Sequence, residues 1–265
     1  MDERLKTNLA HWNDSVAIHE RSAMYRLEEF KAGRDSLRAI EIEELGDIRG
    51  KSLLHLQCHF GLDSISWARR GARVTGIDFS DKAIARAREL SAELQIPARF
   101  ICTSIEDAPR ALDEQFGIVF TSYGALCWMP DVRRWAHVAA HFVKPGGTFY
   151  IAEFHPLTQS FDTDNPTELR PRISYFHTEM QEWPAEPDYA DRATMHQHGT
   201  HQWMYTTSGV VSALIDAGLK VEFLHEFPQC NFKFFQFMQQ DAQGWWRIPG
   251  DPIPLLFSIK AVRPV

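Results

Sequence analysis

Between Lys51 and Phe154 the sequence alternates short apolar runs with longer amphipathic runs, and this alternation constrains the fold more than any other feature. The apolar runs predict strands over 52–56, 73–77, 98–103, 117–122 and 148–154. The amphipathic runs predict helices over 62–70, 80–94 and 131–142. Strands separated by helices form a parallel sheet with right-handed crossovers, so the sequence predicts a doubly wound α/β domain with helices on both faces.

The segments on either side of this core complete the predicted domain. Residues 1–50 are expected to form an N-terminal helical cap, because apolar residues from Leu5 to Val16 recur three or four positions apart. Residues 155–207 hold a run rich in Pro, His, Asp and Trp that is too long for an ordinary connection, and we expect a lid or insertion there. The remainder, 208–265, contains one predicted helix and two adjacent strands, at 208–217, 220–227 and 255–262. These strands predict an antiparallel C-terminal hairpin, and hence a seven-stranded, mostly parallel sheet in a single domain spanning 1–265.

Composition narrows the classes of partner. A net charge of −7 without a Lys/Arg run argues against nucleic acid, because phosphate backbones are bound by clustered positive charge. No stretch approaches a membrane span and no apolar signal region is visible, so we expect a cytoplasmic protein with no membrane partner. The four cysteines never form a C-x-x-C pair, and Cys58 and Cys102 lie in apolar runs, which favours buried, reduced thiols. The oligomeric state, monomer or homodimer, stays open.

A candidate ligand-binding loop follows the first predicted strand. In doubly wound folds, ligands bind beyond the carboxyl ends of the strands, where a glycine lets them approach the backbone. Gly61 lies in that first turn, and Asp78 ends the second strand. Because an acidic residue at about this spacing accepts hydrogen bonds from ribose hydroxyls, the pair indicates a nucleoside-containing ligand.

Four segments of the core, in the right order, resemble the motifs of class I S-adenosylmethionine-dependent methyltransferases. Leu54 to Gly61 stands where that family has its Gly-x-Gly-x-Gly loop, and Val74 to Ser80 resembles its second motif. The segments 116–131 and 143–148 resemble its fourth-strand motif and the turn before its fifth strand. The resemblance covers residues 51–155, including a cofactor-binding core at 51–154. It implies a Rossmann-like fold, S-adenosylmethionine as cofactor and methyl transfer to a small-molecule acceptor.

The resemblance also implies particular cofactor contacts. Asp78 is expected to hold the ribose hydroxyls, and Phe79 to lie against the adenine. Ser104 and Ile105 are expected at the edge of the base, and Ser122 at the methionine end. The cofactor-binding residues implied are Gln57, His59, Phe60, Gly61, Asp78, Phe79, Ser104, Ile105 and Ser122.

The chain departs from the family where an acidic residue and glycines are usual. His55 replaces the acidic residue, Gln57 and His59 replace two glycines, and Ser104 replaces an aspartate after the third strand. These changes keep open the alternative of a degenerate or non-catalytic domain that binds an adenosyl ligand. A nicotinamide-dependent oxidoreductase is disfavoured, because Gln57 and His59 stand where a diphosphate needs bare backbone. The acidic charge disfavours a methyltransferase that acts on RNA or DNA.

Residues beyond the fourth and fifth strands are candidates for a general base. A base is useful when the acceptor carries a proton at neutral pH, and His155 and Tyr123 are the predicted catalytic residues. The alternative is that His155 only hydrogen-bonds the adjoining turn. From the N-terminal cap, Trp12, His19 and Tyr25 are predicted to bind the substrate.

Three polar or aromatic segments invite other hypotheses. His196 to His201 contains three histidines, but no matching Cys or acidic set is evident, so no metal site is predicted. Residues 162–164 lack the rest of a calcium loop and are predicted to form a polar turn. The aromatic segment 232–246 lines an apolar acceptor pocket or, alternatively, caps the sheet edge.

Overall fold

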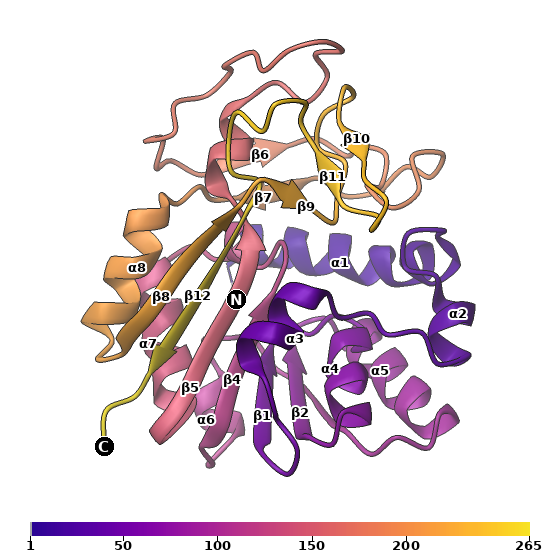
Figure 1. Cartoon of the computed structure of the whole chain (residues 1–265). Coiled ribbons are helices and arrows are strands. Elements are labelled where there is room, and N and C mark those ends of the chain that lie inside the picture. Colours follow the sequence, from indigo (N-terminus) through magenta and orange to yellow (C-terminus); the bar gives the residue numbers. More distant parts are fainter. Residues whose placement is uncertain (1) are drawn as a thin grey trace.

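The computed structural model describes residues 2–265 and contains the predicted α/β sheet (Figure 1). Seven strands lie in the order β3-β2-β1-β4-β5-β12-β8. Their bounds are β1 (Ser52–Leu56), β2 (Arg73–Asp78), β3 (Arg99–Cys102), β4 (Phe116–Ser122), β5 (Val143–Phe154), β8 (Lys220–Phe227) and β12 (Leu256–Val262). The first five strands are parallel, and β12 pairs antiparallel with both β5 and β8. The predicted seven-stranded, mostly parallel sheet with an antiparallel C-terminal pair is therefore confirmed.

Helices cover both faces of the sheet. One face packs against α3 (Ala39–Leu45), α4 (Leu62–Arg69) and α5 (Asp81–Glu93). The other packs against α6 (Ala108–Ala111), α7 (Val132–Phe142) and α8 (Thr207–Asp216). The alternation along β1 explains how the sheet joins the two layers, because Leu53 and Leu54 are both fully buried but belong to opposite layers.

Local sequence accounts for where these elements begin and end. The Ser80 side chain accepts a hydrogen bond from the Ala83 N–H at 3.0 Å and caps α5 as expected. One expected boundary was wrong: β5 already begins at Val143, and the predicted turn over 144–147 is a bulge within it. The register jumps there because Gly146 takes a left-handed φ of +71°.

A second layer lies over the carboxyl ends of the strands. It contains the 3-10 helices η1 (Leu126–Trp128) and η2 (Pro156–Ser160) and two small sheets. The small sheets are formed by β6 (Gln181–Trp183), β7 (Thr200–Gln202), β9 (Gln229–Cys230), β10 (Gln239–Gln240) and β11 (Trp246–Arg247). In Figure 1 this layer stands above the main sheet, and α1 (Glu3–Arg21) runs between the two, with α2 (Leu27–Lys31) beyond its end.

The packing of α1 differs from the expected apolar stripe. Its buried residues include Asn8 and His19, whereas Trp12 is only partly buried. The reason is that α1 meets the second layer through hydrogen bonds: Asn8 donates to the His201 carbonyl and accepts from the His201 N–H, each at 2.8 Å. This amide pairing joins the N-terminal cap to β7.

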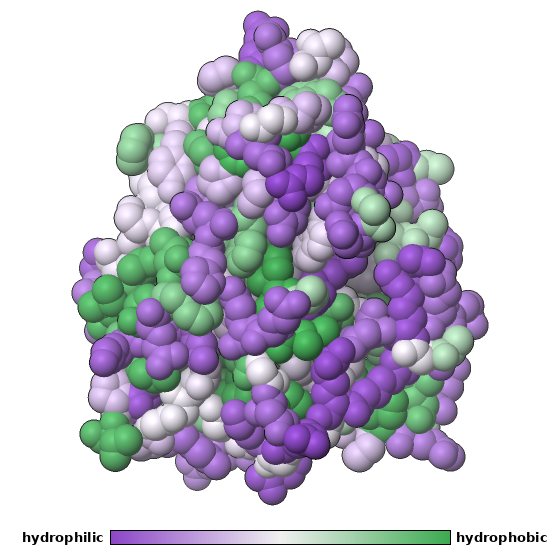
Figure 2. Space-filling view, viewed as in Figure 1, coloured by the Kyte–Doolittle hydropathy of each residue, from purple (hydrophilic) through white to green (hydrophobic). Residues whose placement is uncertain are grey.

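Figure 2 shows hydrophilic residues over much of the face seen in Figure 1, with apolar residues both near its centre and on the side of α8 and β8. Within residues 2–265, no helix has the length and apolarity needed to cross a membrane.

The four cysteines are free, and Cys58 is buried as expected. Cys102 is exposed, contrary to expectation, because it ends β3 at the edge of the sheet.

Candidate active site

A cavity of about 1250 Å³ lies at the carboxyl ends of β1, β2, β4 and β5. Its walls come from the main sheet, the N-terminal helices and the second layer. A pocket for one small ligand has a volume of roughly 300–1,000 Å³. The cavity is therefore large enough for two ligands, and it lies where doubly wound folds bind them.

The loop between β1 and α4 keeps a glycine-like backbone with few glycines. Gln57 and His59 adopt left-handed φ angles of +57° and +50°, and Gly61 has a φ of +84°. A left-handed residue with a Cβ costs roughly 1–2 kcal/mol, so the loop stores strain at two positions. At position 61 only glycine fits without a shift of its neighbours, because a Cβ there would lie 2.8 Å from the Phe100 ring.

The Gln57 side chain is held by the protein and does not block the cavity. Its amide donates to the Ala125 carbonyl at 2.8 Å and accepts from the Trp135 indole N–H at 3.2 Å. These bonds tie the β1–α4 loop to the segment after β4 and offset part of the backbone strain.

Asp78 faces the same loop from the end of β2. Its carboxylate accepts the His59 N–H at 2.8 Å and the Ser80 N–H at 2.9 Å. Burial raises the pKa of Asp78 to about 6, and these hydrogen bonds oppose that rise. The predicted neighbours of the base, Phe79 and Ser104, also line the cavity.

A polar cluster lies where the family has its acidic residue. His55 is buried, its Nδ1 is 2.8 Å from the Ser64 hydroxyl, and burial lowers its pKa to about 4, so it is neutral. Asp63, in the first turn of α4, accepts hydrogen bonds from Ser122 at 2.9 Å and from Ser36 at 2.7 Å. Asp63 and Ser122 line the cavity. Asp63 thus places a carboxyl group beside this cluster.

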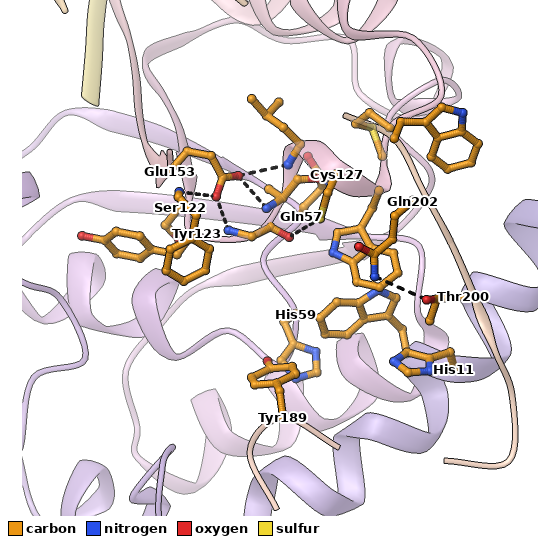
Figure 3. A pocket seen from close by; sticks show the side chains of 18 of the residues that line it. His11, Gln57, His59, Ser122, Tyr123, Cys127, Glu153, Tyr189, Thr200 and Gln202 are labelled. Carbon is orange, nitrogen blue, oxygen red and sulfur yellow. Dashed lines mark hydrogen bonds between the residues drawn. The ribbon is translucent and has the colours of Figure 1, made fainter. Parts of the chain in front are cut away.

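Glu153, near the end of β5, organises the segment after β4. Its carboxylate accepts the N–H groups of Gly124, Ala125 and Leu126, the latter two at 2.7 and 3.0 Å (Figure 3). Burial raises the pKa of Glu153, and these backbone hydrogen bonds favour its ionised form. The result is a fixed cavity wall that continues into η1.

Tyr123 lines the cavity but its hydroxyl is engaged elsewhere. The hydroxyl donates to the Glu41 carboxylate at 2.7 Å. Glu41 is fully buried in α3, and burial raises its pKa to about 8. Burial also raises the pKa of Tyr123, so its hydroxyl stays protonated and acts as a donor.

The position of His155 corrects the expectation of a general base. The buried ring does not line the cavity, and its Nε2 lies 2.8 Å from Glu226 and 3.1 Å from the Thr207 hydroxyl. Its Nδ1 accepts the Leu157 N–H at 3.2 Å and caps η2. Both nitrogens have protein partners, so His155 fastens the turn, as the alternative interpretation proposed.

Residues of the N-terminal cap reach the cavity on its other side. Trp12 and Tyr25 line it, whereas His19 is fully buried behind the wall. His59 and Tyr189, labelled in Figure 3, also line the cavity. The Tyr25 and Tyr189 hydroxyls are 2.5 Å apart, which links the cap to the second layer.

The three remaining segments are accounted for by other contacts. His196 bonds Asp188 at 2.6 Å, and within residues 2–265 no group of three or more His, Cys, Asp or Glu is placed to hold a metal ion. Asp162 accepts the Asp164 N–H at 3.0 Å in a polar turn. Segment 232–246 was expected either to line an acceptor pocket or to cap the sheet edge, and its residues differ. Phe232 lines the cavity, whereas Phe235 is buried in a separate core cluster.

Most of the predicted site residues therefore meet in one cavity. Those that line it are Trp12, Tyr25, Gln57, His59, Phe60, Gly61, Asp78, Phe79, Ser104, Ile105, Ser122 and Tyr123. Sequence reasoning missed Asp63, Glu153, Asp188 and Glu41. Only Asp63 left a signal, since it lies two residues beyond Gly61 in the motif.

Comparison with known proteins agrees with this geometry. A family model described as a methyltransferase domain matches residues 53–147. Ubiquinone biosynthesis O-methyltransferases from Hydrogenovibrio crunogenus and Alkalilimnicola ehrlichii are 29% and 35% identical over 157 and 117 residues. The alignments cover 57% and 44% of this chain, and 64% and 47% of those proteins. Residues 53–147 therefore match a methyltransferase domain, and the chain spans about half to two thirds of the length of these relatives.

Solved structures show the same fold. An S-adenosylmethionine-dependent methyltransferase from Mesorhizobium loti superposes with a TM-score of 0.61 at 21% identity, covering 88% of this chain and 100% of that one. The glycopeptide N-methyltransferase MtfA, in complex with S-adenosylmethionine, gives a TM-score of 0.57 at 18% identity, covering 85% and 92%. The predicted Rossmann-like methyltransferase fold is confirmed.

Proposed function

We propose that this protein binds S-adenosylmethionine in the cavity and transfers its methyl group to a small acceptor molecule. The observation that carries the proposal is the pairing of Asp78 with the left-handed β1–α4 loop at the cavity wall. A left-handed loop lets a ligand approach the backbone, and the carboxylate accepts ribose hydroxyls. The match of residues 53–147 to a methyltransferase domain supports the same cofactor.

The lining residues fit the parts of this cofactor. Asp78 holds the ribose, and Phe79, Ser104 and Ile105 surround the adenine. Asp63 takes the part of the missing family acid and pairs with the ammonium group of the methionine moiety. Because Gln57 is held by Ala125 and Trp135, its side chain leaves room for that moiety.

The second layer and α1 provide the acceptor side of the cavity. Trp12, Tyr25, Trp128, Tyr189 and Phe232 give this side an aromatic lining, which favours a planar, apolar acceptor. The likeness to O-methyltransferases of ubiquinone biosynthesis supports a hydroxyl as the methylated group. The chain matches about half to two thirds of the length of those proteins, so the identity of the acceptor belongs to this proposal.

When bound, the sulfonium supplies an electrophilic methyl group, and the protein has to align the acceptor with it. Positioning of this kind contributes up to roughly 7–11 kcal/mol to lowering a barrier. The cap and second layer keep water from the reacting atoms, because they cover the cavity opposite the sheet.

Calorimetric titration with S-adenosylmethionine and S-adenosylhomocysteine tests the proposal. We expect micromolar binding of both, no binding of NAD, and loss of binding in Asp78→Ala. If neither adenosyl ligand binds, the methyltransferase proposal is refuted and the degenerate, non-binding alternative is favoured. Binding without turnover, whatever the acceptor, would favour the non-catalytic adenosyl-binding alternative.

A further inference from the structure

A chain of hydrogen-bonded side chains runs from the second layer through α1 to the β1–α4 loop. The Asp188 Oδ2 atom lies 3.1 Å from His19 Nε2, and His19 Nδ1 lies 2.8 Å from His59 Nε2. Asp188 and His19 are almost completely buried, at 1% and 0% exposure. The three residues come from three separate parts of the chain, so this relay forms only when the fold is complete.

The carboxylate fixes the position of each proton along the relay. Burial opposes ionisation of Asp188, but hydrogen bonds from His19, Ala190 and His196 hold its pKa at about 2. An ionised carboxylate accepts only, so His19 must donate from Nε2 and therefore accept at Nδ1. His59 then donates from Nε2, which leaves the lone pair on its Nδ1.

The free nitrogen of His59 has no partner in the described part of the chain. Its Nδ1 is buried without a hydrogen bond, and its ring lines the cavity beside Trp12, with ring centroids 5.1 Å apart. A buried acceptor atom without a donor costs about 1–3 kcal/mol. A ligand O–H beside this ring would supply the missing donor.

We propose that His59 is the general base of the transfer reaction and that His19 and Asp188 are positioning residues that fix its tautomer. The inference rests on the proposed methyltransferase function and assigns His59 a catalytic role in addition to the cofactor contact expected from the sequence. The substrate class it implies is an aromatic acceptor with a hydroxyl group that must lose its proton. An acceptor already unprotonated at neutral pH would need no such base.

The proton and electron balance is simple. As the acceptor oxygen forms its bond to the methyl carbon, the carbon–sulfur bond breaks and its electron pair stays on sulfur. The hydroxyl proton moves to His59 Nδ1, giving an imidazolium whose Nε2–H is still bonded to His19. Asp188 stabilises that positive charge through His19, and the proton leaves to water after the product departs.

Other titratable groups around the relay are compatible with this role. Burial lowers the pKa of His59 and of His19, which keeps both neutral before the reaction. The remaining ionisable groups near the two imidazoles are His11, Tyr25, Asp78, Tyr189 and His196. Of these, Asp78 bonds the His59 backbone and not its ring.

Nuclear magnetic resonance of the full chain with nitrogen-labelled histidine tests the tautomer directly. We expect His59 to be protonated at Nε2 and bare at Nδ1 at neutral pH, with the signal assigned through His59→Gln. Asp188→Asn, which can both donate and accept, should release the tautomer into a mixture. Tyr189→Phe is the matched control, since it removes a neighbouring hydroxyl outside the relay and should leave the tautomer unchanged. A proton on Nδ1 in the unaltered protein would overturn the inference.

Transfer to hydroxylated aromatic acceptors tests the catalytic role. We expect kcat to fall 100-fold or more in His59→Gln while the Kd for S-adenosylhomocysteine changes less than fivefold, in line with a general base. Asp188→Asn should lower kcat. It should also shift the acidic limb of the pH profile of kcat/KM to lower pH, because the Asp188 carboxylate raises the pKa of His59. Undiminished transfer in His59→Gln would refute the inference alone. Absence of S-adenosylhomocysteine binding in the unaltered protein would refute the proposed function itself.

Discussion

Lowering the pH from 7 to 5 should weaken cofactor binding, because the Asp78 carboxylate becomes protonated. Burial raises the pKa of Asp78 to about 6, and its ionised form is the better acceptor for ribose hydroxyls. With that pKa, only about one-eleventh of the molecules carry the charge at pH 5, compared with about nine-tenths at pH 7. If binding requires the carboxylate, the Kd for S-adenosylhomocysteine should therefore rise about tenfold between pH 7 and pH 5.

Isothermal calorimetry at the two pH values measures this change, and Asp78→Asn is the matched control. The variant keeps the shape of the side chain but cannot ionise, so its Kd should be weaker and nearly independent of pH. Any titration of the ligand itself affects both proteins equally and cancels in the comparison. An equal pH dependence in both proteins would refute the assignment of Asp78 to the ribose.

Three further predictions follow from buried groups. Burial raises the pKa of Glu41 from 4.5 to about 8, so its contribution to stability is full below pH 4.5 and is lost as pH rises towards 8. Over this pH range the free energy of unfolding, measured with urea, should fall more steeply in the unaltered protein than in Glu41→Gln, by about 1.4 kcal/mol per pH unit. Gly61→Ala should destabilise by about 3 kcal/mol, through φ strain and collision with Phe100. Gly218→Ala, at a φ of +86° in open space just after α8, should cost only about 1 kcal/mol, and equal costs would contradict the packing argument. His155→Gln should lower the free energy of unfolding by about 1–3 kcal/mol and leave transfer rates intact, and a large loss of kcat would restore it as a catalytic candidate.

The sheet could be predicted from the sequence because its signals are local. Alternating runs and caps such as Ser80 depend on neighbouring residues, and they were enough to predict the seven strands and helices α4, α5, α7 and α8. The four-residue helix α6 was not predicted. The ligand-binding edge followed from the same alternation, since Asp78 and Gly61 end and follow adjacent strands.

On the acceptor side, Trp12 and Tyr25 were expected to bind the substrate and do line the cavity, but the contacts that hold this side together were not predicted. Those contacts join distant parts of the chain. His19 meets Asp188 across 169 residues, and the insertion that holds Asp188 lacks regular periodicity. His155 was misassigned for the same reason: its partner Glu226 lies 71 residues further on, on a strand that packs away from the cavity. The loop substitutions at Gln57 and His59 kept open the alternative of a degenerate domain, yet the backbone there keeps the left-handed conformation of glycine.

Labelled methyl groups followed from S-adenosylmethionine to a panel of small hydroxylated aromatic compounds provide the decisive test of methyl transfer by this protein. We expect at least one compound to gain the label, with one S-adenosylhomocysteine formed for each methyl transferred, and we expect Asp78→Ala to abolish both products. If the protein binds S-adenosylmethionine tightly but neither product forms with any small acceptor, the chain is a binding domain and the proposed catalysis is wrong.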